Sequence, residues 1–490
     1  MTHKFKNVSM LLFGAMFFLV ACQNDAAQEV VDNHTPTEIA DVKAAYTTKV
    51  SVDDAKRVAG LFNGAGGESR ALKVIKEIKV VEDENGTPTM YVVNFANNQG
   101  FVLVSATRNF LPVLAYNDEG NFTIPEENVN GLSLWMEKTK QNVKIADALP
   151  ADSTAKFRSE WNKYEEQGGL ELADSRSANS ELDQYAIQLT SQWYQNGVEW
   201  CSLEDAQAFL PASQYQAWSE LVAGAIDLSY QDVNPLTYSF VVTEFTDDGS
   251  GSVDNFINTN WYQKGGYNDR IQTEYNGIDY AAGCTTIALA QIMKYHEFPS
   301  IFNWDAMEDD YATATTAYFI FDLAERIDVD YGVNGTDAGI DDMKNALISY
   351  GYSTNIISVN HNIDIVRNEL NNRRPVCMTG YSNRVGHAWV ACGYNITRSH
   401  IDYKLYVPVQ NASMGSPYVN IEDCLGEQTN RVYFYMNWGK GGGNGLYNDY
   451  DLSSNMPAGL NINVAYDDDR IDIINIFPLN ACPTRNKTNI

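Results

Sequence analysis

The sequence predicts an α+β fold that is divided into two or three domains, and three observations support this prediction. The chain has 490 residues, which is too long for one ordinary hydrophobic core. Two apolar, strand-like runs flank a glycine turn at residues 90–105, and mostly helical patterns follow to about residue 230. In residues 246–490 a helix-rich half precedes a strand-rich half, which is typical of an α+β domain.

The composition indicates a globular protein that does not bind nucleic acid. Hydrophobic residues make up 44% of the chain and aromatic residues 12%, as in proteins with packed cores. The formal net charge of −29 argues against a nucleic-acid partner, because a phosphate backbone is bound by clustered Lys and Arg. A soluble, exported protein fits the same charge.

The first 22 residues have the pattern of a bacterial signal peptide. Lys4 and Lys6 precede an apolar run at residues 10–21, which is too short to span a bilayer comfortably. The L-V-A-C sequence at residues 19–22 resembles a lipobox, in which Cys22 is lipidated and becomes the first residue after cleavage. The alternative is a plain signal peptide in which Cys22 is incidental. A lipidated Cys22 predicts a protein anchored to a bilayer, in the periplasm or at the cell surface, with release possible after maturation.

The remaining elements follow in chain order. Residues 23 to about 50 are polar and acidic and predict a tether. Helical patterns cover residues 132–148 and most of residues 151–230, a loop is expected at residues 247–252, and an apolar helix at residues 284–298. Five strands are expected beyond this helix, at residues 374–380, 387–394, 402–409, 431–437 and 470–477.

The cysteines other than Cys22 form no metal-binding pattern. The sequence has no C-x-x-C, no H-E-x-x-H and no paired Cys/His spacing, so neither a metal nor another cofactor is expected. Cys377 and Cys392 lie in apolar runs, which predicts buried thiols. Export would permit a disulfide between Cys424 and Cys482, and the sequence leaves that pairing open.

Cys284 lies in the first turn of the apolar helix at residues 284–298. A helix N-terminus presents free N–H groups and a partial positive charge, which lower the pKa of a thiol. The same N–H groups can hold an oxyanion after attack on a carbonyl. Cys284 is therefore either a catalytic nucleophile or a structural cysteine near a helix cap.

A thiolate nucleophile requires an imidazole partner, and His387 has the most suitable position. It begins an apolar strand, whereas His361 and His400 lie in polar stretches that predict solvated loops. His296 would lie ~18 Å along the helix from Cys284, since the helix rises ~1.5 Å per residue. A cysteine at a helix N-terminus and a histidine at the mouth of a strand together favour a catalytic Cys284–His387 pair.

A glycine-rich loop at residues 437–447 carries Asn437 and Trp438. Such side chains beside a catalytic imidazole can fix its tautomer and exclude water from the ion pair. The loop lacks the spacing of a phosphate-binding loop and has no basic surroundings, so nucleotide binding is not expected.

Taken together, these motifs resemble the streptopain-type cysteine peptidases, which are relatives of papain. The family's nucleophile helix, its G-H-A-x-V strand and its N-W-G-W-G-G loop are similar to GCTTIALAQIMKYH at residues 283–296, GHAWV at residues 386–390 and NWGKGG at residues 437–442. Residues 259–268 resemble the segment that supplies an oxyanion-hole glutamine, which maps to Gln263. The resemblance spans residues 255–478.

The resemblance implies a papain-like, two-lobed peptidase domain at residues 246–490. Its Cys284 would attack the peptide carbonyl, and His387 would protonate the departing amine. Gln263 would bind the oxyanion, and Trp438 would shield the catalytic pair. Protein or peptide substrates are the expected partners.

Residues 100–122 also resemble the inhibitory prosegment of this family, and equally the free inhibitors related to it. The resemblance therefore implies that residues 23–240 hold the tether and a separate α+β prosegment domain. The peptidase would be made as a latent zymogen that its own prosegment inhibits. We expect maturation to cut the chain between about residues 227 and 252.

The chain departs from the family pattern in three places. Lys440 stands where the family usually has Trp, an insertion covers roughly residues 395–430, and residues 150–240 have no counterpart. These departures leave the substrate preference open. One rival interpretation is an inhibitor-like or adhesive binding protein with an inactive peptidase domain, although Cys284 and His387 are both present. Another is an enzyme that transfers acyl groups to amines instead of water.

Overall fold

The computed structural model describes most of the chain from residue 48 onward. The described ranges are 48–62, 73–125, 131–149, 154–164, 181–195, 198–207, 210–225, 234–332, 335–382, 385–408, 418–440, 442–450 and 470–479. The expected signal peptide, Cys22, nearly all of the tether, and Cys482 lie outside these residues. Within them, no helix has the length and apolar character needed to cross a membrane.

The N-terminal described region is an antiparallel sheet with three helices. Its elements are α1 (Val52–Leu61), β1 (Ile75–Glu82), β2 (Pro88–Phe95), β3 (Phe101–Ser105), β4 (Val113–Asn117), α2 (Gly131–Ala148) and α3 (Ala155–Trp161). The predicted hairpin is confirmed, because β2 pairs with β3 from Met90 to Asn94. Its connection uses left-handed backbone at Asn97, Asn98 and Gly100, which favours Asn and Gly.

The described residues between 181 and 253 form a group of helices that leads into one long strand. They comprise α4 (Glu181–Gln195), β5 (Glu199–Ser202), α5 (Leu203–Ala206), α6 (Ala212–Ala225), α7 (Pro235–Tyr238) and β6 (Phe240–Val253). The prediction of a loop at residues 247–252 is wrong, because this stretch pairs with a strand much later in the chain. That pairing overrides the low strand propensity of Asp, Gly and Ser.

The C-terminal region contains the predicted helix and most of the predicted strands. Its helices are α8 (Asp269–Glu274), α9 (Cys284–His296), α10 (Ala314–Ile327), α11 (Ile340–Ser349) and α12 (Ile363–Asn371). Its strands are β7 (Asp330–Gly332), β8 (Gly335–Asp337), β9 (Ile357–Asn360), β10 (Val376–Ser382), β11 (Val385–Pro408), β12 (Tyr418–Asn437), β13 (Gly445–Asn448) and β14 (Ile471–Ile474). The mixture of helices and antiparallel strands confirms the α+β fold class.

β11 and β12 are much longer than expected, because the insertion at residues 395–430 continues them as an antiparallel pair. The strands predicted at residues 387–394 and 402–409 are one strand, β11. β6 pairs along the other edge of β11, from Val253 to Phe240. We call the described residues within 181–253 and 395–432 the accessory subdomain. It has a core of its own, which includes Leu203, Trp218, Val241 and Leu405.

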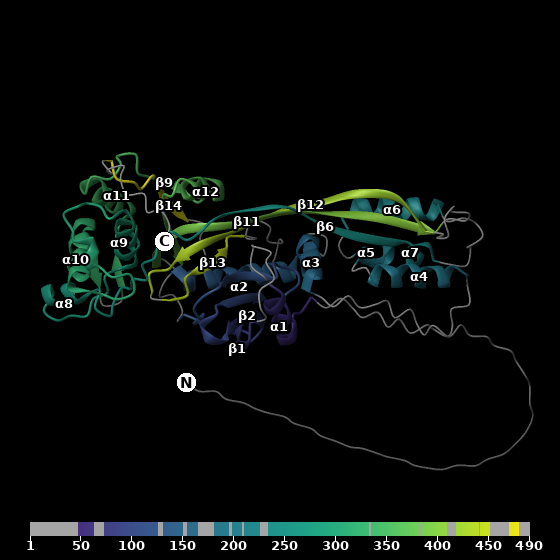
Figure 1. Ribbon diagram of the computed structural model, residues 1–490, viewed down its shortest axis with the longest axis horizontal. Coiled ribbons are helices and arrows are strands. Elements are labelled where there is room, and N and C mark those ends of the chain that lie inside the picture. Colours follow the sequence, from purple (N-terminus) through teal and green to yellow (C-terminus); the bar gives the residue numbers. More distant parts are fainter. Residues whose placement is uncertain are drawn as a thin grey trace, which may run out of the picture. The chain divides into compact units, whose positions relative to one another are not determined.

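One sheet runs through the N-terminal and C-terminal regions (Figure 1). Its strand order is β1-β2-β3-β4-β13-β12-β11-β10-β14-β9. The junction is the pair β4–β13, in which Tyr116 lies opposite Leu446 and Ala115 opposite Tyr447. The Asn448 side chain also donates to the carbonyl of Leu114 over 2.7 Å. The prosegment-like region therefore extends the sheet of the C-terminal region by backbone pairing.

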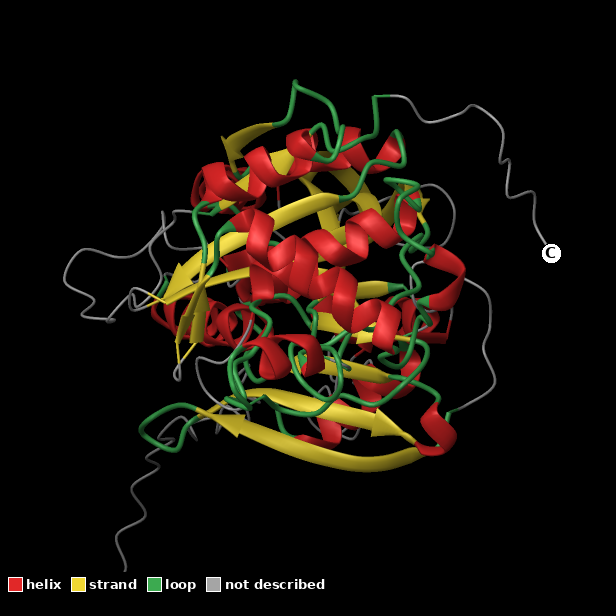
Figure 2. Ribbon diagram, turned by 90° about the vertical axis from the view of Figure 1, so that its left-hand side faces the viewer, coloured by secondary structure: helices red, strands yellow, loops and turns green. Residues whose placement is uncertain are grey.

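Alternate residues of β11 face two different cores. Ala388, Val390 and Cys392 pack with α9 and its neighbours, whereas Trp389 and Ala391 pack with α2. This alternation follows from the two-residue period of a strand. In Figure 2, which views the molecule from the side of α8 to α11, helices cross in front of the strands that they cover. As expected, the thiols of Cys377 and Cys392 are buried.

Candidate active site

Cys284 is the first residue of α9, and Gly283 fixes the backbone before it. Gly283 has a φ of 91°, which is a left-handed conformation that favours glycine. A Cβ atom at this position would lie 3.1 Å from Cγ2 of Thr336. Both constraints hold the Cys284 thiol at the N-terminus of α9, where the sequence placed it.

The Cys284 thiol lies against β11 at the residue next to His387. Its Sγ accepts a hydrogen bond from the backbone N–H of Ala388 over 3.4 Å. Ala388 directly follows His387, and consecutive Cα atoms are ~3.8 Å apart. His387 itself is buried, with 7% of its surface exposed. The structure therefore brings the two residues of the expected catalytic pair to neighbouring positions.

Three other histidines have structural positions. His296 lies at the far end of α9, as expected, with its Nδ1 atom 3.3 Å from the Tyr352 hydroxyl. The prediction of a solvated loop at His400 is wrong. His361 does lie in a loop, between β9 and α12, but its side chain is not solvated. His400 lies within β11 and pairs with Asp248 of β6 at 2.7 Å. His361 is buried between two carboxylates, which are described below.

Burial raises the pKa of the Cys284 thiol, although backbone N–H groups, including that of Ala388, lower it. The carboxylate of Asp337 adds to the increase. The lowered pKa expected at a helix N-terminus is therefore not found in this structure, because desolvation outweighs the backbone N–H groups. Burial raises the pKa more strongly at three further thiols, those of Cys201, Cys377 and Cys392.

Gln263 lies close to Cys284 through its backbone. Its carbonyl accepts a hydrogen bond from the N–H of Ala282 over 2.9 Å, and Ala282 is two residues before Cys284. The adjacent Tyr262 forms an isolated antiparallel bridge with Lys440, the residue that replaces the family's Trp. Gln263 is half-buried. Its position fits the oxyanion role that the resemblance implies.

Asn437 bonds to the segment that leads to Gln263. Its Nδ2 donates to the carbonyl of Thr259 over 2.6 Å, and its Oδ1 accepts from the N–H of Gly439 over 3.2 Å. The side chain is almost fully buried, at 1% exposed. The Asn437 side chain therefore bonds to Thr259 and Gly439, whereas it was expected to orient the imidazole.

Trp438 lies in an aromatic cluster beside the His387 strand. Its ring centroid is 5.5 Å from that of Trp389 and 5.0 Å from that of Tyr447. Trp389 is two residues from His387, and the two share one face of β11. This placement agrees with the expected shielding role of Trp438.

The N-terminus of α2 covers this tryptophan pair. Gly131, its first residue, lies so close that a Cβ atom there would be 2.6 Å from Cε3 of Trp389 and 3.0 Å from Cε3 of Trp438. Only glycine fits such an approach without displacing an indole ring. The prosegment-like region therefore contacts the face of β11 that carries His387.

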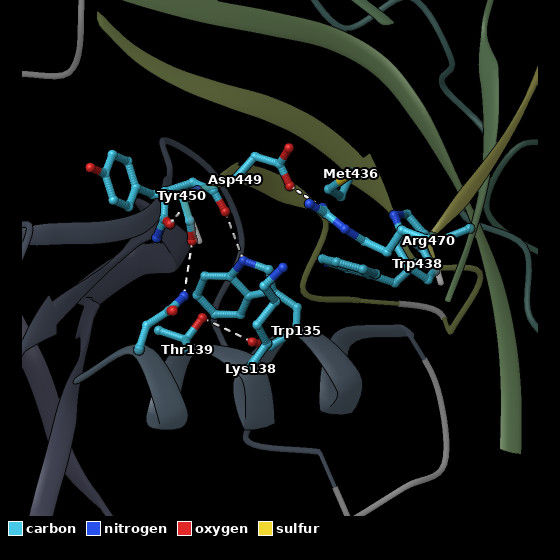
Figure 3. Close-up of a pocket in the computed structure, with 11 residues that line it drawn as sticks. Trp135, Lys138, Thr139, Met436, Trp438, Asp449, Tyr450 and Arg470 are labelled. Atoms are coloured by element: carbon cyan, nitrogen blue, oxygen red, sulfur yellow. Dashed lines mark hydrogen bonds and ion pairs between the residues drawn. The ribbon is translucent and has the colours of Figure 1, made fainter. Parts of the chain in front are cut away.

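Trp135, one turn later on α2, binds the helix to the C-terminal region (Figure 3). Its indole N–H donates to the carbonyl of Asn448 over 2.9 Å. Its ring packs edge-to-face on Tyr447, with the centroids 4.8 Å apart. Two turns further along α2, the Asn142 side chain donates to the carbonyl of Tyr450 over 2.9 Å. Hydrogen bonds and aromatic contacts thus join the two regions.

Asp449 and Arg470 line a cavity beside Trp135 (Figure 3), and both belong to a buried charge network. Asp449 pairs with Arg470 and, at 2.5 Å, with Nε2 of His361. The Nδ1 atom of His361 lies 2.8 Å from Asp472. Burial lowers the pKa of His361, but the carboxylates outweigh it and raise that pKa to about 9. Burial raises the pKa of Asp449, but Arg470 and His361 hold it well below its usual range.

Sequence analysis did not identify this network. A usable signal was Asp472 in the otherwise apolar run at residues 471–474, since a charge in a buried strand requires a partner. The partners themselves, His361 and Asp449, come from distant parts of the chain and have no local signature.

Two protein families match parts of the chain. Residues 47–143 match the Spi protease inhibitor family, and residues 261–301 and 300–450 match the Peptidase C10 family. A solved fragment of prointerpain A from Prevotella intermedia is 14% identical, with a TM-score of 0.41 over 82% of this chain and 98% of that fragment. No curated protein matches the chain.

Proposed function

Because residues 261–450 belong to the Peptidase C10 family, this chain is a cysteine-type endopeptidase of the streptopain family, and we propose that Cys284 and His387 carry its chemistry. The match of residues 47–143 to the Spi protease inhibitors makes it a latent peptidase with an inhibitor-type prosegment. The finer mechanism rests on the geometry around Cys284.

His387 removes the proton from the Cys284 thiol, and the thiolate attacks the substrate's peptide carbonyl to form an S–C bond. The Cys284 N–H and the Gln263 side-chain amide stabilise the oxyanion. His387 then protonates the departing amine as the C–N bond breaks. Water, deprotonated by His387, attacks the thioester and releases the acid, which restores the thiol.

The observation that supports this assignment best is the hydrogen bond from the Ala388 N–H to Cys284 Sγ. It holds the thiol against the residue that follows His387, which supports a pairing of Cys284 with that imidazole. Alkylation with iodoacetamide, followed by peptide mapping of the matured enzyme, tests it. Cys284 should be modified first, and faster than in the precursor, where burial raises its pKa. Preferential modification of another cysteine would contradict the assignment.

Latency follows from how the prosegment is attached. β4 extends the peptidase sheet at β13, and α2 covers Trp389 and Trp438. A covalently tethered inhibitor has an effective concentration of ~mM, so even modest affinity keeps it bound. Cutting the connection allows it to dissociate and be degraded, which makes activation irreversible.

We extend the proposal to the location of the protein. The sequence L-V-A-C at residues 19–22 follows a basic start and a short apolar run, as in bacterial lipoprotein signal peptides. Lipidation of Cys22 would hold the precursor at the membrane on the exported side. Synthesis in a latent form would protect the proteins that it meets during export.

A further inference from the structure

The segment from Thr259 to Gln263 is bonded to the central helix through one buried amide. Gln291, in the middle of α9, accepts from the Thr259 hydroxyl over 3.1 Å and from the Trp261 N–H over 3.3 Å at the same Oε1 atom. The Trp261 N–H can only donate, so this contact fixes which end of the amide faces the segment. Gln291 is fully buried.

Gln291 also has a hydrogen-bond donor that is buried and unsatisfied within the described part of the chain. Its Nε2 atom is buried and has no hydrogen-bond partner among the described residues. A buried, unsatisfied donor opposes folding, and an apolar side chain of similar size would avoid it. We therefore attribute the role of Gln291 to its Oε1 acceptor, which bonds to Thr259 and Trp261.

Asn437, the last residue of β12, bonds to the same segment. Its Nδ2 donates to the Thr259 carbonyl, while its own carbonyl is fixed by the N–H of Gly439. In the β11–β12 ladder Asn437 lies opposite Val390, and paired residues project from the same face of a sheet. His387 is three residues from Val390, and alternation places it on the other face. Asn437 thus faces the oxyanion segment rather than the imidazole.

We propose that Gln291 and Asn437 are positioning residues that act through Thr259 to set the oxyanion-hole segment. Gln263 is four residues beyond Thr259, and its carbonyl is bonded to Ala282 beside the nucleophile. Bonds from Gln291 of α9 and from Asn437 at the end of β12 hold the start of this short segment. These bonds therefore determine the position from which the Gln263 side-chain amide donates to the oxyanion. This inference rests on the proposed Cys284–His387 mechanism.

The test separates the oxyanion hole from the Cys–His pair. Hydrolysis of a peptide needs both, whereas alkylation of Cys284 by iodoacetamide needs the thiolate and forms no oxyanion. Full-length precursors carrying Gln291→Met or Asn437→Ala would be matured by a trace of tagged wild-type enzyme, which is then removed. Losing one oxyanion donor costs ~10²–10³ in kcat, so displacing one should lower kcat by about tenfold to a hundredfold, mainly without a change in KM.

The alkylation rate of Cys284 and its pH profile should stay within about twofold of wild type in both variants. Gln291→Glu, which retains an acceptor at Oε1, should recover most of the activity. A slower alkylation or a shifted pH profile in Asn437→Ala would show that Asn437 orients the imidazole and would overturn the proposal. Wild-type kcat in both variants would also overturn it.

Thr259 provides a second test if the Gln291 and Asn437 variants fold poorly. Thr259→Val removes the hydroxyl that donates to Gln291 Oε1, and Thr259→Ser retains a hydroxyl. We expect Thr259→Val to have a lower kcat than wild type and Thr259→Ser to have a wild-type kcat. Equal kcat values in the two variants would contradict the positioning role of Gln291. Failure of the proposed function is recognised separately, because Cys284→Ala would then still hydrolyse peptides.

Discussion

The indole N–H of Trp135, in the prosegment, donates to the backbone carbonyl of Asn448, in the peptidase, over 2.9 Å. Asn448 ends β13, the strand that pairs with β4 of the prosegment. A side-chain bond and a backbone ladder thus meet at one place. The prosegment is therefore bound both as an added strand and through an aromatic anchor, which is how a small interface concentrates its binding energy.

Trp135→Ala should weaken latency. It removes the hydrogen bond and the edge-to-face contact with Tyr447, and truncating a buried Trp costs ~3–5 kcal/mol. The open form should become at least about a hundredfold more populated, since 1.4 kcal/mol is about tenfold. The measurement is the rate at which the purified precursor matures. Glu137→Gln, on an exposed part of the same helix, is the control, and equal rates in the two variants would contradict the anchoring role.

His361 should make stability fall at alkaline pH. Its pKa is raised to about 9 in the folded chain, against ~6.5 when unfolded. A raised histidine pKa gives a stabilising contribution that is fully present below pH ~6.5 and is lost as the pH rises through about 9. The shift corresponds to roughly 3 kcal/mol.

The free energy of unfolding of the Cys284→Ala precursor, measured between pH 6 and 10, tests this. With His361 present, the free energy of unfolding should fall as the pH rises through about 9. His361→Gln should remove most of this decrease. His400→Gln serves as the matched control, because His400 is more exposed and pairs with Asp248 at the surface. A flat profile with His361 present would contradict the prediction.

The accessory subdomain should remain with the mature peptidase. β6 pairs with β11 along its length, and α6 contributes Trp218 to the core beneath β11. Removing residues 181–225 would expose that apolar core to water. Residues 240–252 are part of the interval in which the sequence predicts the maturation cut. Cleavage there would require β6 to separate from β11 first.

Mass spectrometry of the matured enzyme after gel filtration measures what is retained. We expect residues 181–225 to co-elute with the peptidase, either in one chain or as a bound fragment. A fragment beginning at residue 181 should fold, whereas one beginning at residue 246 would lose the first part of β6. Mature enzyme that lacks residues 181–225 and has unchanged thermal stability would contradict this prediction.

Cys22→Ser should release or misprocess the protein. Each buried methylene of an attached acyl chain is worth ~0.8 kcal/mol of membrane binding, and the substitution removes the sulfur that would carry the chains. The wild-type precursor should fractionate with membranes and the variant should not. Cys424→Ser, which changes a cysteine of the accessory subdomain, should fractionate like wild type. An unmodified Cys22 in the membrane-bound protein would contradict the lipoprotein assignment.

The sequence was most informative where the signal is local. The apolar pattern of α9, the β2–β3 hairpin and the positions of Cys284 and His387 could be predicted, because periodicity and flanking glycines report them directly. The long β11–β12 pair could not, because the polar residues of the insertion are stabilised by pairing with β6, about 150 residues earlier in the chain.

The roles that depended on partners were harder to predict. Asn437 could be linked to the active site by its motif, but its bond to Thr259 appears only in the folded chain. His361 looked solvated because its neighbours in sequence are polar, whereas its charge is balanced by Asp449 and Asp472 from distant parts of the chain. The pKa of Cys284 was predicted from the helix alone, and burial reversed its direction.

The most direct test of the Cys284–His387 mechanism is the rate of peptide hydrolysis by the matured His387→Ala enzyme, compared with the matured His296→Ala enzyme. Both variants would be processed by removable wild-type enzyme and checked for wild-type thermal stability. Removing the general base should reduce kcat at least ~10²-fold, whereas His296→Ala, which changes the far end of α9, should retain activity. A well-folded His387→Ala enzyme that hydrolyses peptides at the wild-type rate would contradict the account.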